Sequence, residues 1–250
     1  MKLALLSDIH SNLQALDACL DHARQQGATD WALLGDLVGY GGDPVAVLDR
    51  VMALAQAGAT VLLGNHDQMA LAPPPQSDRL GEATSQWTHD QLRPDHRAFL
   101  AALPLTARLP ACLLVHASAD APEKWRYVED ERSAQASLEA ATLEPDVRYV
   151  FGGHVHHQTL YYKGSGRSLM AFAPTPGVPI PTPGHRQWIA TIGSVGQPRD
   201  GQPRAMYALF DLPQARLTFH RVPYDHAGAA AAVRRAGLPE YFAQRLEEGR

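Results

Sequence analysis

The first apolar run of the chain is LALLSDIH, Leu3 to His10, in which four apolar residues are followed by a serine, an aspartate and a histidine. A short apolar run that ends in polar residues is typical of a strand buried on both faces. Four later runs end in the same way, in the stretches WALLGD, ATVLLGNHD, ACLLVHAS and VRYVFGGH. The fold prediction therefore starts from five buried strands, each ending in residues able to bind a metal ion.

The segments between the first three runs have the apolar spacing of amphipathic helices. Ser11 is a suitable N-cap for the first helix, and Gly27 is well placed to end it. Asp43 followed by Pro44 is the expected start of the second helix, which Gly58 ends. The alternation of strand and helix predicts βαβ units around a largely parallel sheet, and so an α/β fold.

The rest of the chain departs from that alternation. We expect helical insertions at 68–110 and 121–145, where polar, helix-compatible sequence separates core strands. After the fifth run, strand-like stretches separated by turn residues predict antiparallel hairpins. The Pro- and Gly-rich stretch 173–184 is expected to be a surface loop. A helical tail at 227–250 completes what we expect to be a single domain spanning 1–250.

The composition narrows the class of protein. The 250 residues are 45% hydrophobic and carry a formal net charge of −4, so no basic character points to a nucleic-acid partner. Cys19 and Cys112 are the two cysteines, which fits a reducing compartment. No stretch approaches the ~20 apolar residues of a membrane span. We therefore expect a cytoplasmic protein that has no membrane partner.

The polar residues at the ends of the five runs form the candidate site. Ligands of open α/β sheets bind beyond the carboxyl ends of the strands, so we expect these residues to meet along one rim. They are Asp8, His10, Asp36, Asn65, His66, Asp67, His116, His154 and His156. Each motif alone is weak, because Asp-x-His is common and GNHD suits a polar turn. Together they predict a metal pair, since so many buried titratable groups need partners, and these oxygen and nitrogen ligands suit Mn, Fe, Ni or Zn.

In this order, the motifs Asp-x-His, Gly-Asp, Gly-Asn-His-Asp, a strand-end His and Gly-His-x-His resemble those of the calcineurin-like metallophosphoesterases. The stretch GSVGQPRDG at 193–201 and the tail LPEYFAQRLEEGR are similar to a bacterial branch of small phosphodiesterases described as diadenosine-tetraphosphatase-like. The resemblance implies a four-layer α/β/β/α sandwich with mixed sheets and helices on the outside. It also implies a hydrolase with two divalent or trivalent metal ions, whose identity the sequence leaves open.

The resemblance implies a role for each matching residue. The first metal ion would be held by Asp8, His10 and His156, the second by Asn65, His116 and His154, and Asp36 would bridge the two. A hydroxide between the ions would attack phosphorus. His66 would face the substrate, stabilise the transition state and protonate the leaving oxygen.

Three further residues are weaker candidates. Asp67 is expected to orient His66 through a hydrogen bond, although a turn-forming role explains it equally well. Arg199 would contact phosphate oxygens, and the alternative is a turn residue in a hairpin. His157 lies just past the ligand pair, where it either contacts substrate or is exposed.

These residues predict a binuclear-metal phosphoesterase that acts on a small organic phosphate, either a phosphodiester or a phosphomonoester. The alternatives are a nuclease, which the negative charge disfavours, and a metal-free protein-binding scaffold, which the complete ligand set disfavours. A protein phosphatase or symmetric dinucleoside polyphosphate hydrolase would carry an arginine where this chain has Tyr40, which weakens that hypothesis. The sequence indicates neither the physiological substrate nor the oligomeric state.

Overall fold

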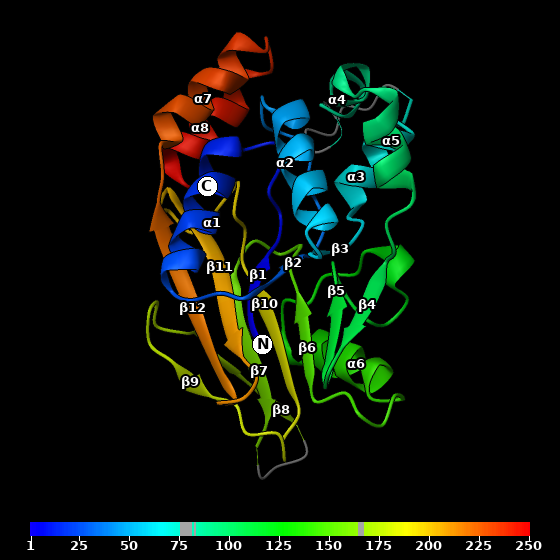
Figure 1. Ribbon diagram of the computed structural model, residues 1–250, viewed down its shortest axis with the longest axis vertical. Coiled ribbons are helices and arrows are strands. Elements are labelled where there is room, and N and C mark those ends of the chain that lie inside the picture. Colours follow the sequence, from blue (N-terminus) through cyan, green and yellow to red (C-terminus); the bar gives the residue numbers. More distant parts are fainter. Residues whose placement is uncertain (76–81, 83, 165–167) are drawn as a thin grey trace.

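Two β-sheets packed face to face form the centre of the computed structural model, which describes residues 1–75, 82, 84–164 and 168–250 (Figure 1). The first sheet has the strand order β3-β2-β1-β11-β12-β9. Its strands are β1 Lys2–Leu6, β2 Asp30–Leu33, β3 Thr60–Val61, β9 Ile180–Pro181, β11 Arg204–Asp211 and β12 Arg216–Pro223. The second sheet has the order β4-β5-β6-β10-β7-β8. Its strands are β4 Thr106–Leu109, β5 Cys112–Val115, β6 Tyr149–Gly152, β7 Gln158–Lys163, β8 Leu169–Phe172 and β10 Trp188–Ile192.

Strand β1 shows why the first apolar run has no polar alternation. Leu3 and Leu5 point into the core between the two sheets, which also contains Phe151 of β6 and Phe210 of β11. Leu6 belongs to a different core, beneath the helices that cover the first sheet. Because successive side chains of a strand point to opposite faces, a strand buried on both faces must be apolar throughout. The prediction of buried strands rests on this constraint.

Helices cover the outer face of each sheet, which gives four layers (Figure 1). The helices are α1 Leu13–Gln25, α2 Pro44–Gln56, α3 Asn65–Leu71, α4 Ser85–Gln91, α5 Pro94–Ala101, α6 Glu131–Ala141, α7 His226–Arg235 and α8 Glu240–Glu248, with a 3₁₀ turn η1 at Pro122–Lys124. Helix α1 packs on β11 and β12 and contacts α2 and α7, whereas α6 packs on β8 and β10. The α/β/β/α arrangement with mixed sheets is confirmed. Within the described ranges, no helix is long and apolar enough to cross a membrane.

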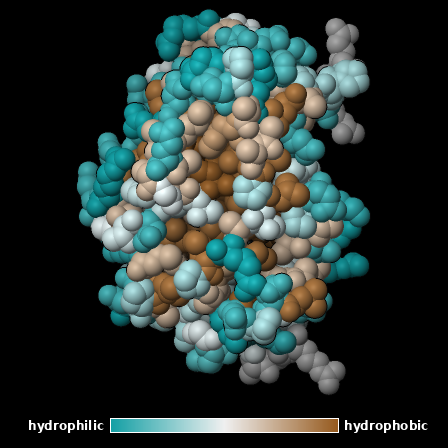
Figure 2. All heavy atoms as spheres, turned by 45° about the vertical axis from the view of Figure 1, so that its right-hand side comes forward, coloured by the Kyte–Doolittle hydropathy of each residue, from teal (hydrophilic) through white to brown (hydrophobic). Residues whose placement is uncertain are grey.

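Hydrophobic side chains gather across the middle of the face turned forward in Figure 2, while its upper end is mostly hydrophilic.

The parallel strand pairs are β1 with β2, β2 with β3, β5 with β6, and β6 with β10. The other pairs are antiparallel, including the hairpin β11–β12. Since β11 also pairs with β1, the first sheet joins the two ends of the chain.

Several local predictions were wrong or incomplete for physical reasons. The first helix is capped by Asn12, whose side chain accepts a hydrogen bond from Ala15 N at 3.0 Å; the main chain of Ser11 instead bonds to the carbonyl of Leu37. The third run is a strand over Thr60–Val61 alone, and Asn65 begins helix α3.

The expected insertions also contain structure of another kind. The range 68–110 includes strand β4, which pairs with β5, as well as helices. Strand β7 was not predicted, and β10 lies parallel to β6 rather than only in hairpins. The Pro-rich stretch 173–184 contributes the two-residue strand β9. Residues 76–81, 83 and 165–167 of the expected insertion and hairpins lie outside the described residues.

A buried histidine in β12 links the fold to pH. The ring of His220 stacks on Tyr207 with centroids 4.8 Å apart and lies 5.1 Å from the ring of His22. Its Nε2 atom is buried, and no described residue hydrogen-bonds to it. Burial, with His22 nearby, lowers the pKa of His220 to about 4. His220 therefore stays neutral in the folded state at pH values where the same histidine is protonated in the unfolded chain.

We expect His220→Phe to reduce acid sensitivity. The stability that a neutral His220 contributes is lost as pH falls from the ordinary pKa of histidine through the lowered one. The loss between about pH 7 and about pH 5 is about 2 kcal/mol. Urea unfolding at the two pH values should show a smaller loss in the variant. His185→Phe, at an exposed position, is the control. An equally steep pH dependence in His220→Phe would contradict this assignment.

Candidate metal centre

The candidate residues of both sheets meet at one end of the sandwich. Asp8 and Asp36 follow β1 and β2 of the first sheet, and His116 follows β5 of the second. The main-chain N–H of His154, beyond β6, donates to Asp8 Oδ2 at 2.9 Å, which joins the two sheets directly. We predicted one rim of one open sheet; instead, the carboxyl ends of parallel strands in two stacked sheets face a shared site.

The backbone at these strand ends is left-handed. Asp8, His10, Asp36, His154 and His156 have φ between 49° and 68°. This conformation costs on the order of 1–3 kcal/mol per non-glycine residue and persists only where the surroundings enforce it. Here Asp8 N bonds to Gly35 O and His10 N to Asp36 O, each at 3.0 Å. In a regular strand, successive side chains point to opposite faces; these turns instead bring the side chains of the five residues into the two clusters described below.

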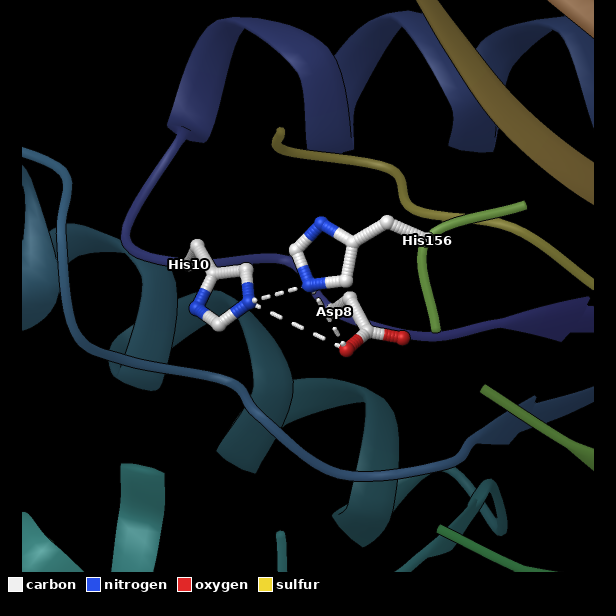
Figure 3. Close-up of side chains that lie close together, drawn as sticks. All are labelled: Asp8, His10 and His156. Carbon is white, nitrogen blue, oxygen red and sulfur yellow. Dashed lines mark hydrogen bonds and ion pairs between the residues drawn. The ribbon is translucent and has the colours of Figure 1, made fainter. Parts of the chain in front are cut away.

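Asp8, His10 and His156 form the first cluster, with one potential ligand atom from each within 4.8 Å of the others (Figure 3). His10 Nδ1 lies 3.2 Å from Val38 O, and His156 Nδ1 lies 2.7 Å from Gln197 O. A carbonyl only accepts, so each Nδ1 carries the proton and each Nε2 presents a lone pair.

Those two Nε2 atoms are only 3.1 Å apart, and Asp8 Oδ1 lies 3.2 Å from that of His156. Burial lowers the pKa of His10 and of His156, so both rings are neutral. Acceptor atoms converge with no proton between the two imidazoles, which is the arrangement that a cation requires.

Asp36, His116 and His154 form the second cluster, also buried and within 4.8 Å. His116 Nδ1 lies 2.8 Å from Leu34 O, which leaves Nε2 facing Asp36 Oδ2 at 3.4 Å and Asn65 Oδ1 at 3.1 Å. The buried Nε2 of His154 has no hydrogen-bond partner among the described residues. The donor set, two imidazoles, a carboxylate and an amide oxygen, suits a transition-metal ion.

Asp36, a member of the second cluster, also faces the first. Its Oδ2 is 3.7 Å from His10 Nε2 and 3.4 Å from His116 Nε2, and its Oδ1 accepts from the main-chain N–H of His66 at 2.8 Å. Burial disfavours a charged His116, but Asp36 raises the pKa of that ring to about 9. A proton on His116 therefore occupies the place that a cation would take.

The carboxylate of Asp67 contacts backbone N–H groups, which favours the second of the two roles considered for it, a role in a turn. Its Oδ1 accepts from the main-chain N–H groups of Leu37 and Val38 at 2.9 and 3.1 Å, and its Oδ2 accepts from Gly64 at 2.9 Å. No hydrogen bond in the described part of the chain joins it to the ring of His66. A carboxylate that satisfies three buried N–H groups fixes the loop after β2 to the start of α3, so Asp67 positions loops rather than an imidazole.

His66 and the predicted substrate contacts surround the clusters. The ring of His66 lies 4.4 Å from that of Tyr40 and 5.0 Å from that of His10. Arg199 Nη2 donates to Gln197 Oε1 at 2.9 Å, and its guanidinium lies 6.0 Å from the Tyr40 ring. His157 is exposed, and its Nδ1 bonds to Val155 O.

Two hollows open beside the clusters. One, of about 460 Å³, is lined by Asn65, His66 and His154 together with Trp125 and Tyr127. The other, of about 500 Å³, is lined by Tyr127, His157 and Arg199 among others. Sequence reasoning missed Trp125 and Tyr127, because an aromatic residue in a polar segment carries no positional signal of its own.

The chain is similar to proteins of one family. A model of the calcineurin-like phosphoesterase superfamily domain matches residues 1–215. The uncharacterized protein MJ0912 of Methanocaldococcus jannaschii is 29% identical over 254 residues, which cover 99% of this chain and 98% of that protein.

Two solved structures share the fold over the whole chain. A metallophosphoesterase from Sphaerobacter thermophilus is 34% identical with a TM-score of 0.87, and the match covers 100% of this chain and 99% of that one. The hypothetical protein PH1004 from Pyrococcus horikoshii OT3 is 19% identical with a TM-score of 0.77, over 100% and 98% of the two chains. The second likeness concerns the fold alone.

We expect Asp67→Ala to destabilise the protein strongly, because it leaves three buried N–H groups without an acceptor. The free energy of unfolding should fall by about 2–4 kcal/mol, measured by urea denaturation in the presence of a chelator so that metal binding does not contribute. Asp67→Asn keeps one acceptor oxygen and should lose less. The control Asp21→Ala, at an exposed position of α1, should change the free energy of unfolding little. A loss of stability in Asp67→Ala no larger than in Asp21→Ala would refute the loop-positioning role.

Proposed function

The chain belongs to the calcineurin-like phosphoesterase superfamily, and we propose that it hydrolyses a small organic phosphate at a pair of metal ions held by the two buried clusters. Membership of the family makes the protein a metal-dependent hydrolase of phosphate esters. The pair of ions, the ligand assignment and the kind of substrate are our proposals. Strand β1, which precedes Asp8, pairs with β11 from the other end of the chain. We therefore treat 1–250 as one catalytic domain.

The position of Asp36 carries the proposal. One carboxylate oxygen faces an imidazole nitrogen of each cluster, at 3.7 Å to His10 and 3.4 Å to His116. We assign Asp8, His10 and His156 to one ion, Asn65, His116 and His154 to the other, and Asp36 to both. When bound, two ions such as Mn, Fe, Ni or Zn offset charge on phosphoryl oxygens and promote deprotonation of the attacking water.

The remaining residues act on the substrate. Burial lowers the pKa of His66, and a neutral ring carries one N–H for a phosphoryl or leaving-group oxygen. Its backbone N–H donates to Asp36 and its ring lies 5.0 Å from that of His10, which places the ring beside the clusters. Arg199 donates to the side chain of Gln197, whose main-chain carbonyl accepts from His156 Nδ1, and its guanidinium offers a cation for a phosphate oxygen.

We expect Asp36→Ala to lower kcat/KM for bis(4-nitrophenyl) phosphate by at least about a hundredfold after reconstitution with Mn. Elemental analysis should show fewer ions bound per chain than in the wild type, because both clusters lose the shared carboxylate. Asp21→Ala, an exposed aspartate, is the control. Near-wild-type turnover by metal-loaded Asp36→Ala would exclude the bridging assignment, and a wild-type protein that binds no metal would favour the scaffold alternative.

We expect His66→Gln to retain both ions while kcat falls by about a hundredfold or more. His66 lies beside the clusters without belonging to either, so metal content and KM should change little. His185→Gln, an exposed histidine, should behave as wild type. Loss of an ion from His66→Gln would show that the ring is a ligand and not a donor to the substrate.

A further inference from the structure

An aromatic wall stands over the second cluster. Trp125 and Tyr127 follow the 3₁₀ turn η1, in a segment that sequence reasoning assigned only to an insertion. The Trp125 ring lies edge-on to His116 with centroids 5.7 Å apart. The Tyr127 ring stacks on His154 with centroids 4.2 Å apart and planes 25° apart. Each aromatic ring thus contacts a histidine of the cluster.

The wall is fixed in place. Trp125 Nε1 donates to Gln68 Oε1 of α3 at 3.1 Å, which joins this segment to the helix that begins at Asn65. Trp125 has a left-handed φ of 50°, and its main-chain N–H bonds to Pro122 O. The segment is also joined to α6, where Ser137 Oγ accepts from Ala119 N at 2.9 Å. The Trp125 side chain is thereby held by α3, and the main chain that leads to it is held by α6.

Tyr127 has one ring face free. His154 covers one face, yet the residue is 54% exposed. Tyr127 also lines both hollows beside the clusters, the one of about 460 Å³ with His66 and His154 and the one of about 500 Å³ with Arg199. Tyr127 therefore stands between a hollow lined by His154 of the second cluster and a hollow lined by Val155 and His157, the chain neighbours of His154 and His156.

We propose that the free face of the Tyr127 ring is a stacking subsite for a planar aromatic group, of the size of a nucleobase, and that the substrate is a phosphodiester with one organic group in each hollow. The proposal rests on the proposed function. A monoester has a single organic group and would leave one hollow unused. Hydrolysis then adds a water oxygen to phosphorus and breaks one ester P–O bond, and the leaving oxygen gains a proton. The products are a phosphomonoester and an alcohol.

Equilibrium binding tests the subsite separately from catalysis. Adenosine 5′-monophosphate and methyl ribofuranoside 5-phosphate both have a closed ribose ring and differ in the base, so calorimetry on the metal-loaded protein reports the contribution of the base. We expect the base to improve Kd by at least about tenfold in the wild type and in Tyr127→Phe, and this advantage to disappear in Tyr127→Leu. Phe172→Leu removes another exposed aromatic ring, from β8, and this variant should retain the advantage of the base. Equal affinities in the wild type would overturn the subsite even if the variants did not fold.

Hydrolysis tests the choice of ester. Phosphorus NMR follows the methyl ester of adenosine 5′-monophosphate and adenosine 5′-monophosphate itself side by side. Faster turnover of the diester supports the two-hollow arrangement, and faster turnover of the monoester overturns it. Failure of the proposed function is recognised separately, because a protein without phosphoesterase activity would also leave bis(4-nitrophenyl) phosphate intact.

Discussion

The buried negative charge of Asp36 is the constraint on which the rest of the site depends. This carboxylate is almost inaccessible to water, and it contacts the backbone of α3 and an imidazole of each cluster. A carboxylate in such a place must be compensated, and the surrounding histidines provide only partial compensation because most are kept neutral by burial. Both sheets and the start of α3 converge around Asp36, where the buried negative charge requires a positive charge.

Much of this was predictable from the sequence, because strands buried on both faces are apolar and polar residues at their ends stand out. The five strand ends were identified, as were the residues of both clusters that they bring together. The stacking of two sheets was not derivable from the strand ends alone, since nothing in Asp8 or His154 states that their strands belong to different sheets. The resemblance to a known family supplied that part of the architecture.

Other misses have local causes. The GNHD stretch suits a turn and a helix start equally, and tertiary contacts decide that Asn65 begins α3. Asp67 adjoins His66 in the chain, but in the fold its carboxylate is closest to the N–H groups of a different loop. Strand β7 escaped notice because QTLYYK follows the histidine-rich turn without a break. Partners of this kind depend on distances that no periodicity encodes.

The left-handed turns that carry the ligands have a consequence for selectivity among ions. A flexible site moves its donors toward the bond lengths and angles that each ion prefers, so its affinities follow the intrinsic order of the metals. Five of the proposed ligand residues have an unfavourable backbone conformation, and main-chain hydrogen bonds between neighbouring loops hold Asp8, His10 and Asp36 in it. Adapting to a different ion would require those loops to move together. A cradle held in this way would favour the ions whose preferred bond lengths and angles match it.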